Sequence, residues 1–225
     1  MEKLLEILKN ESIKTALDIQ KSDFQYKSLE KLNKNLNSII LLDLVLANSI
    51  ICYQLSSSGE AYWEEFSNYF SNFNWKNFDI INELKLFIIN SKWNKRFVDT
   101  KAKRLDKLKP FLDDFSKSRE ILINDFTNLQ KNLAKTMNQK TTDKTIVFAI
   151  KMLGYAISIY YKKDIVFPFE ISIPIDSRLT NLYEKYNTNS NLKIDEFYDI
   201  LSKKLNIPPL SLDAILWVNY EKFIN

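Results

Sequence analysis

One lysine lies inside an otherwise uncharged segment of the chain. The stretch TIVFAIKMLGYAISIYY, residues 145 to 161, contains sixteen uncharged residues and Lys151. A free lysine amine has a pKa of about 10.4, so it is protonated at neutral pH and is not nucleophilic. Burial disfavours the charged form, and a neutral amine in a pocket can form a Schiff base. A structural lysine would instead extend its stem and place its ammonium group in water. The helical pattern alone leaves both interpretations open.

Asp176 is the second candidate for a chemical role. It ends the extended stretch DIVFPFEISIPID, residues 164 to 176, and precedes a helical pattern. Aspartate is a favoured N-cap residue, and a plain cap is the simpler interpretation. A carboxylate at a helix N-terminus also stays ionised, as an electrostatic catalyst requires. The two roles are therefore compatible.

Basic and aromatic segments are the features that could contact a nucleic acid. Residues 92 to 109, KWNKRFVDTKAKRLDKLK, contain eight Lys or Arg and two Asp. Such a run suits phosphate contacts, although most charge runs are solvated helix faces. Trp63 and Trp217 lie in aromatic-rich segments. Their default place is the protein core, but a pocket for a planar base would use such rings as well.

The composition excludes several kinds of chemistry. The 225 residues contain no histidine and a single cysteine, Cys52, which excludes the commonest general base, disulfides and cysteine zinc clusters. The net charge of +4 argues only weakly for an anionic partner. The N-terminal segment has no apolar core of signal-peptide type, and no run of about 18 apolar residues lacks a charge. We therefore expect a soluble, intracellular, cytoplasmic protein without a membrane span.

The elements that must position these residues are predicted to be helices. Two glycines and five prolines are too few for the many tight turns of a β-sandwich or barrel. Residues 164–176 are predicted to be extended, as a loop or one short strand. The apolar spacing predicts helices over residues 2–19, 38–56, 58–70, 76–91, 97–109, 116–136, 144–162, 177–186, 194–205 and 209–223. About ten helices with short connections indicate an all-α protein, and we expect a single unit, residues 1–225, of two packed helical lobes.

Five sequence blocks together resemble one protein family. In chain order they are YQLSSSGEAYWEEFSNYF, SKWNKRFVDTKAKRL, TIVFAIKMLGYA, FEISIPIDSRL and LDAILWVNY. This series resembles the archaeal 8-oxoguanine DNA glycosylase (AGOG) family, which belongs to the helix-hairpin-helix superfamily of base-excision glycosylases. The resemblance extends from about Gln25 to Trp217, and it implies that residues 117–181 form the helix-hairpin-helix and catalytic region.

The resemblance assigns roles to individual residues. Lys151 matches the family's Schiff-base nucleophile, and Asp176 matches its catalytic aspartate. The positions that match contacts to the flipped base are Gln25, Cys52, Trp63, Tyr155, Pro174, Asp213 and Trp217. Two of these depart from the family pattern, because Cys52 stands where a serine is expected and Tyr155 where a phenylalanine is expected. A thiol donates a weaker hydrogen bond than a hydroxyl group, whereas Tyr155 keeps the stacking face.

Two segments are expected to contact the DNA backbone. The hairpin should lie within AKTMNQKTTDKT, residues 134 to 145, which lacks a Gly-x-Gly motif. Thr141, Thr142 and Lys144 are the candidates there for holding a phosphate group, and the alternative is that Thr142 or Asp143 caps the next helix. The candidates in the basic run are Lys92, Lys95, Arg96 and Lys101.

The resemblance implies a bifunctional DNA glycosylase and abasic-site lyase. Such an enzyme flips 8-oxoguanine out of single- or double-stranded DNA, attacks the sugar with Lys151 and cleaves the abasic site by β-elimination. It needs no metal or cofactor, and we expect a monomer. Two other classes stay open. A non-catalytic helical nucleic-acid-binding protein would tolerate Lys151→Gln, and a Schiff-base enzyme for a small metabolite would not bind duplex DNA.

Overall fold

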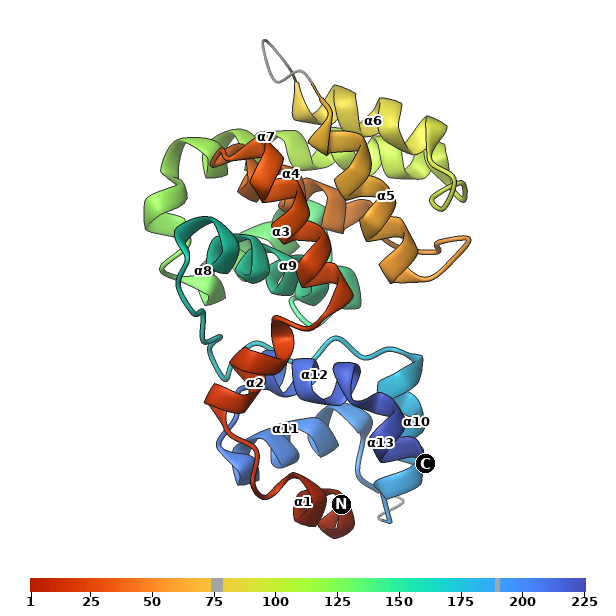
Figure 1. Ribbon diagram of the computed structural model, residues 1–225, viewed down its shortest axis with the longest axis vertical. Coiled ribbons are helices and arrows are strands. Elements are labelled where there is room, and N and C mark those ends of the chain that lie inside the picture. The colour runs from red at the N-terminus through yellow and green to blue at the C-terminus, as the bar shows by residue number, and fades with distance from the viewer. Residues whose placement is uncertain (74–78, 189–190) are drawn as a thin grey trace. The chain divides into compact units, whose positions relative to one another are not determined.

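The described residues are almost entirely helical. Figure 1 shows the computed structural model, which describes residues 1–73, 79–188 and 191–225. Over these ranges the chain forms thirteen α-helices and no β-strand. The predicted all-α class is therefore confirmed, and residues 164–176 form a loop. Residues 76–78 of one predicted helix and part of the polar loop near Asn187 lie outside the described ranges.

The chain divides into two compact units. Unit 1 comprises Met1–Asp23 and Asp164–Asn225, whereas unit 2 comprises Phe24–Lys163. The helices of unit 1 are α1 (Glu2–Leu8), α2 (Ile13–Gln20), α10 (Ser177–Tyr186), α11 (Ile194–Leu205), α12 (Pro209–Val218) and α13 (Tyr220–Ile224). The helices of unit 2 are α3 (Phe24–Leu36), α4 (Ile40–Ile51), α5 (Gly59–Ser71), α6 (Ile80–Asn90), α7 (Val98–Leu122), α8 (Phe126–Met137) and α9 (Lys144–Tyr161). The predicted catalytic region, residues 117–181, thus has residues in both units.

Two helices that are apolar on nearly every face form the centre of unit 2. In α4, eleven of the twelve residues are buried, and α9 is buried continuously from Ala149 to Ile159. A helix without a polar face must be enclosed by other elements. Accordingly α9 packs against α4, α3 and α8, while α3 also packs against α5 (Figure 1). In the described part of the chain, no helix is both long and apolar enough to cross a membrane.

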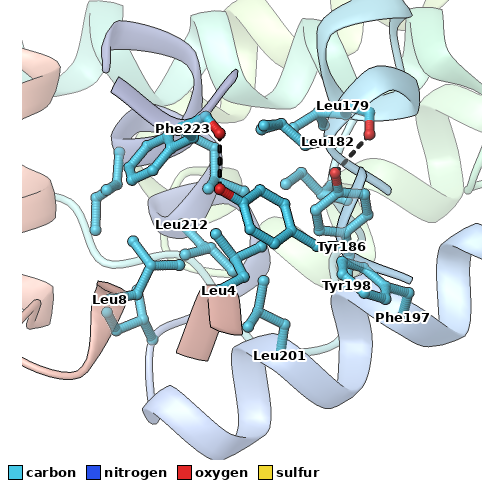
Figure 2. Close-up of a cluster of buried hydrophobic side chains, with 14 of the residues drawn as sticks. Leu4, Leu8, Leu179, Leu182, Tyr186, Phe197, Tyr198, Leu201, Leu212 and Phe223 are labelled. Carbon is cyan, nitrogen blue, oxygen red and sulfur yellow. Dashed lines mark hydrogen bonds between the residues drawn. The ribbon is translucent and has the colours of Figure 1, made fainter. Parts of the chain in front are cut away.

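Unit 1 has a separate hydrophobic core, which Figure 2 shows. Leucines from α1, α10, α11 and α12 surround Tyr186, Phe197, Tyr198 and Phe223. The two tyrosines bury their hydroxyl groups by donating to backbone carbonyl groups. Tyr198 donates to Leu179 O at 2.6 Å, and Tyr186 donates to Phe223 O at 2.7 Å (Figure 2). Because a buried hydroxyl group is costly without a partner, these bonds fix α10 against α11 and α13.

Several predicted helix boundaries are wrong, and local capping explains two of them. The helix predicted over residues 2–19 is interrupted, because Ser12 is the N-cap of α2 and accepts from Thr15 N at 3.1 Å. The helix predicted over residues 209–223 is likewise divided at Asn219. The apolar spacing did not predict α3, whose buried stripe is sparse within a largely polar sequence.

Helix α7 covers the helix predicted over residues 97–109 and the start of the one predicted over 116–136, whose remainder is the separate helix α8 after a break at Asp125. Helix α7 continues through Pro110 and has its non-helical residue at Ser118 instead. Proline removes one backbone hydrogen bond, but Pro110 is on the exposed side, where water can replace that bond. The buried stripe of Leu105, Leu108, Phe111, Leu112 and Phe115 continues past the proline and holds the helix together. At the end of α7, Arg119 Nε donates to buried Asp43 of α4 at 2.9 Å.

Candidate active site

Lys151 is buried at the centre of α9. Only 2% of the residue is exposed, which does not fit a lysine that carries its ammonium group into water. Its Nζ lies 5.4 Å from the centroid of the Tyr155 ring, one helical turn later. Schiff-base chemistry needs a lysine amine enclosed in this way to be neutral when it attacks. The burial argues against a lysine that reaches water, and the chemical role of Lys151 stays a prediction.

Tyr155 is held in place by aromatic and polar contacts. Its ring meets the Tyr26 ring edge to face, with the centroids 5.3 Å apart and an angle of 69° between the planes. The hydroxyl group of Tyr26 is 3.3 Å from Ser158 Oγ, one turn beyond Tyr155 on α9. These contacts join α3 to α9 beside Lys151. Tyr155, which replaces the phenylalanine expected from the family pattern, therefore presents a fixed ring to the amine.

Trp63 and Cys52 lie close together in unit 2. The Trp63 indole is fully buried on α5 against Tyr62, Phe66 and Phe148, with ring centroids at 6.2, 5.2 and 6.3 Å. The Trp63 N–H lies near the Cys52 sulfur and acts to lower the pKa of that thiol. It makes no regular hydrogen bond to a described residue. Burial dominates and raises the pKa of Cys52 to about 12. Cys52 is therefore a neutral thiol at physiological pH and not a competing nucleophile.

Gln25 lies on α3, close to the start of α5. It is 4% exposed, and a Cβ atom placed on Gly59 would come within 3.2 Å of its Nε2 atom. Ser58 caps α5 by accepting from Ala61 N at 3.2 Å, which fixes the first turn of that helix near Gln25. Any side chain at position 59 would press on the amide. Glycine at this position thus keeps room for a buried polar group that is among the predicted base contacts.

Lys101 does not suit the role predicted for it. It is fully buried, and its Nζ donates to Asn94 Oδ1 and lies 4.9 Å from the centroid of the Tyr53 ring. Burial lowers its pKa to about 8, and the neighbouring Cys52 acts in the opposite direction. A DNA phosphate needs an accessible cation, so the predicted backbone contact at Lys101 is not supported. Its burial could not be predicted, because Lys101 lies in the sequence among basic residues that are mostly exposed.

The segment Ser91–Phe97, which we call the aromatic–basic loop, presents the other basic candidates. Lys92, Lys95 and Arg96 are exposed, and Lys92 Nζ lies 4.5 Å from the centroid of the Trp93 ring. The Glu65 carboxylate accepts from Ser91 Oγ at 2.7 Å, Lys92 N at 2.5 Å and Trp93 N at 3.3 Å. The backbone of the loop is thus fixed while its cations face solvent, an arrangement suited to phosphate contacts.

The connection between α8 and α9 is a hairpin built without glycine. Asn138 ends α8 in the left-handed conformation, with φ 52° and ψ 49°, which asparagine tolerates. Asp143 is the N-cap of α9, but its carboxylate accepts from Lys140 N at 3.1 Å and not from the helix. Gln130 Nε2 donates to Thr141 O at 3.0 Å. Thr142 and Lys144 are exposed and Thr141 is half-buried, so a phosphate contact here stays a prediction.

Asp176 caps a helix in unit 1, as its sequence position predicted. It is half-buried and its carboxylate accepts from Leu179 N at 3.0 Å. Pro174, two residues earlier, is buried. The charges of Asp176 and Asp213 both act on Tyr198, whose pKa is raised first by burial and then by these two carboxylates. Unit 1 therefore brings the predicted catalytic aspartate and one predicted base contact near the same buried ring.

The remaining predicted base contact, Trp217, is stacked on a residue that sequence reasoning missed. Arg178 lies over the Trp217 ring, with its guanidinium carbon 3.8 Å from the ring centroid. Asp213 and Trp217 share one face of α12, one turn apart; Asp213 is 2% exposed and Trp217 is half-buried. Arg178 directly follows the Asp176–Ser177 pair, and that proximity was the only available signal.

The predicted site residues fall into two groups. Unit 2 contains Gln25, Cys52, Trp63, Lys151 and Tyr155, and unit 1 contains Pro174, Asp176, Asp213 and Trp217. Within unit 2, three pairs are close: Lys151 with Tyr155, Cys52 with Trp63, and Gln25 with the start of α5. Assembly of both groups into one pocket stays a prediction.

Comparisons with known proteins identify the family of this chain. The AGOG family, described as N-glycosylase/DNA lyase, matches residues 5–224. An N-glycosylase/DNA lyase from Nanoarchaeum equitans is 39% identical over 215 residues, covering 95% of this chain and 88% of the relative. Another, from Methanococcus maripaludis, is 37% identical over 217 residues, covering 95% of this chain and 85% of the relative.

A solved structure matches over nearly the whole chain. It is Pa-AGOG, the 8-oxoguanine DNA glycosylase from Pyrobaculum aerophilum, in complex with 8-oxoguanosine. The TM-score is 0.85 at 25% identity, and the match covers 98% of this chain and 87% of Pa-AGOG. This chain is therefore a member of the AGOG family of N-glycosylase/DNA lyases.

Proposed function

We propose that this protein excises 8-oxoguanine from DNA and then cleaves the abasic site through a lysine Schiff base. The observation that carries the proposal is the buried Lys151 amine on α9, 5.4 Å from the centroid of the Tyr155 ring, at the position of the family's nucleophile. The substrate is single- or double-stranded DNA that contains 8-oxoguanine, the base named for the similar Pa-AGOG. The protein acts as a monomer, without a metal or cofactor.

The chemistry proceeds in two stages on the same amine. Lys151 attacks C1′ of the flipped nucleotide while the N-glycosidic bond breaks, and the bonding electrons leave with the base, which takes up a proton. The nitrogen then loses its two protons while the C1′–O4′ bond breaks and O4′ takes up a proton, which opens the sugar ring and gives an imine at C1′. Removal of a C2′ proton then expels the 3′ phosphate, and water hydrolyses the imine. Asp176 stabilises the positive charge that develops on the sugar during the first stage.

The proposed base pocket combines stacking faces with polar edges. Tyr155 and Trp217 supply rings, while Gln25 and Asp213 read the polar edges of the base. Trp63 supplies a donor, because its buried N–H has no regular partner among the described residues. Cys52 and Pro174 complete the set. A buried donor without an acceptor is costly in the empty protein, and a carbonyl oxygen of 8-oxoguanine would relieve that cost on binding.

Trp63→Phe is expected to reduce lesion recognition. The change keeps a ring on α5 and removes the N–H group, so one hydrogen bond to the base is lost. The ratio of affinities for lesion and undamaged duplexes should fall by about 3- to 10-fold, the usual worth of one hydrogen bond. Equilibrium binding to the two duplexes measures it. Phe66→Leu is the matched control, because Phe66 also packs on Trp63, at 5.2 Å, and has no proposed contact with the base. An equal change in both variants would make Trp63 a purely structural residue.

The proposed grip on the DNA backbone uses two surfaces of unit 2. One is the aromatic–basic loop with Lys92, Lys95 and Arg96, and the other is the hairpin with Thr141, Thr142 and Lys144. Contacts with phosphate groups are independent of sequence and release bound counterions, so they confer affinity without selecting the lesion.

Replacement of Lys95 and Arg96 by alanine is expected to weaken binding to lesion and undamaged duplexes equally. The slope of log K against log salt should become shallower by about 1.8, since each neutralised phosphate contributes about 0.9. Single-turnover excision at saturating enzyme should be unchanged. Lys9→Ala with Lys203→Ala is the control of equal charge, because these lysines already pair with Glu6 and Asp199. If the two double variants have the same affinity and salt slope, the loop does not contact DNA.

A non-catalytic nucleic-acid-binding protein is the competing function. It would bind DNA through the same basic surfaces and would not need an amine inside α9. Sodium borohydride reduces an imine between protein and DNA to a stable bond, so incubation with an 8-oxoguanine duplex separates the two functions. A covalent adduct supports the enzyme. Binding without an adduct and without base release would favour the binding protein.

A further inference from the structure

Phe97 combines three features that stability alone would not select. It has φ 57° and ψ 38°, the left-handed conformation that is costly for a bulky residue. It occupies the N-cap of α7, where its side chain makes no capping hydrogen bond. It is also 59% exposed, although it is a large apolar residue. Glycine, asparagine or serine would suit this backbone position better, so the phenylalanine must serve another purpose.

The backbone on both sides of Phe97 is rigidly held. On the N-terminal side, Glu65 accepts three hydrogen bonds from the loop, and Trp93 O accepts from Ser56 N at 2.9 Å. On the C-terminal side, Lys101 N donates to Phe97 O at 2.9 Å as the first hydrogen bond of α7. The exposed ring is therefore carried by an ordered platform, next to the exposed cations Lys95 and Arg96.

The platform is tied to two residues of the proposed base pocket. Buried Asn94, at the centre of the loop, donates to Ile51 O at 3.2 Å, directly before Cys52. Glu65 follows Trp63 by two residues on α5. The Lys101 ammonium group acts on the Cys52 thiol from one turn beyond Phe97. The strained ring thus belongs to the same rigid part of unit 2 as Cys52 and Trp63.

We propose that Phe97 is an apolar wedge that enters the duplex beside the extruded nucleotide. This inference rests on the proposed function. Flipping a base out of the duplex leaves a gap in the stack, and apolar side chains that insert between base steps fill such gaps. Lys95 and Arg96, which directly precede Phe97, contact the adjacent phosphates. DNA is the partner favoured for an exposed ring that directly follows two exposed cations, because it offers a base face and phosphate charge together.

The first test compares duplex and single-stranded substrates. Phe97→Ala should lower excision from an 8-oxoguanine duplex by about 5- to 100-fold, the range for one lost base–aromatic stack. Excision from a single strand, which has no duplex stack to refill, should change by less than about threefold. Phe97→Trp should retain duplex activity. Ile121→Ala is the matched control, because Ile121 is 76% exposed at the far end of α7, roughly 35 Å along the helix.

A second variant separates function from stability. Phe97→Gly removes the conformational strain, so its midpoint of thermal unfolding should rise by about 1 to 4 °C. Its duplex excision should nevertheless fall as far as that of Phe97→Ala. The wedge is supported if this variant is more stable than the wild type and loses excision on duplex DNA but not on single-stranded DNA.

The outcomes distinguish this inference from the proposed function. If the wild-type protein excises no base from either substrate, the proposed function fails. If the wild type is active and Phe97→Ala excises the base from duplex DNA at the same rate, only the wedge proposal is wrong. Equal losses on duplex and single-stranded substrates would also overturn the wedge, because Phe97 would then contact the lesion strand itself.

Discussion

Lys151→Ala is expected to abolish the covalent adduct that borohydride traps between this protein and an 8-oxoguanine duplex. The adduct needs a lysine amine at C1′, and no other proposed pocket residue has an amine. Base excision should fall by about a thousandfold or more, because loss of a covalent nucleophile removes both stages of the reaction. Denaturing electrophoresis of labelled DNA measures the adduct, and single-turnover release of the base measures excision.

Lys101→Met provides the matched control for that result. Lys101 is another fully buried lysine of unit 2, so the substitution also removes a buried amine. Its ammonium group is held by Asn94 and Tyr53, and the adduct should persist in this variant. An adduct that survives Lys151→Ala but disappears in Lys101→Met would move the nucleophile to α7.

Asp176→Asn is expected to lower excision by about a hundredfold or more while DNA binding stays within about twofold of the wild type. Removal of one electrostatic group that acts on the transition state typically costs 10²- to 10³-fold. Asparagine caps a helix about as well as aspartate, so the hydrogen bond from Leu179 N and the start of α10 should be kept. Single-turnover excision, duplex affinity and thermal unfolding measured together test this.

Asp176→Ala supplies the comparison for the cap. It removes both the charge and the acceptor, and it should lower the free energy of unfolding by about 0.5 to 2 kcal/mol in addition to the loss of excision. Full excision activity in Asp176→Asn would reduce this residue to a helix cap. The catalytic charge would then have to come from elsewhere in the site.

Elements with strong local signals could be predicted from the sequence. The predicted range 177–186 agrees with α10, and 194–205 agrees with α11, because apolar spacing and flanking polar residues coincide there. The range of α9 was predicted to within one residue, and its uniform apolarity correctly implied a central place. The start of α10 at Asp176 followed from the preference of aspartate for N-caps.

Features that depend on tertiary contacts could not be predicted. Lys95 and Lys101 look alike in the basic run, yet one is exposed and the other fully buried against Asn94. The stacking of Arg178 on Trp217 joins α10 to α12, and no local sequence pattern predicts it. The left-handed backbone at Phe97 is set by the anchored loop and the start of α7. A phenylalanine in a sequence normally indicates a right-handed or extended backbone.

The chain path has a consequence for the order in which the protein folds. Unit 2 is continuous in sequence, whereas unit 1 is assembled from segments on both sides of it. During synthesis, unit 2 is complete before α11 and α12, the partners of α1 and α2, have been made. Because domains generally fold as units during synthesis, we expect unit 2 to fold first, while Leu4 and Leu8 still lack their core partners from α11 and α12. Closure of unit 1 is then the late, non-local step, because it needs α10, α11 and α12, which follow unit 2 in the chain.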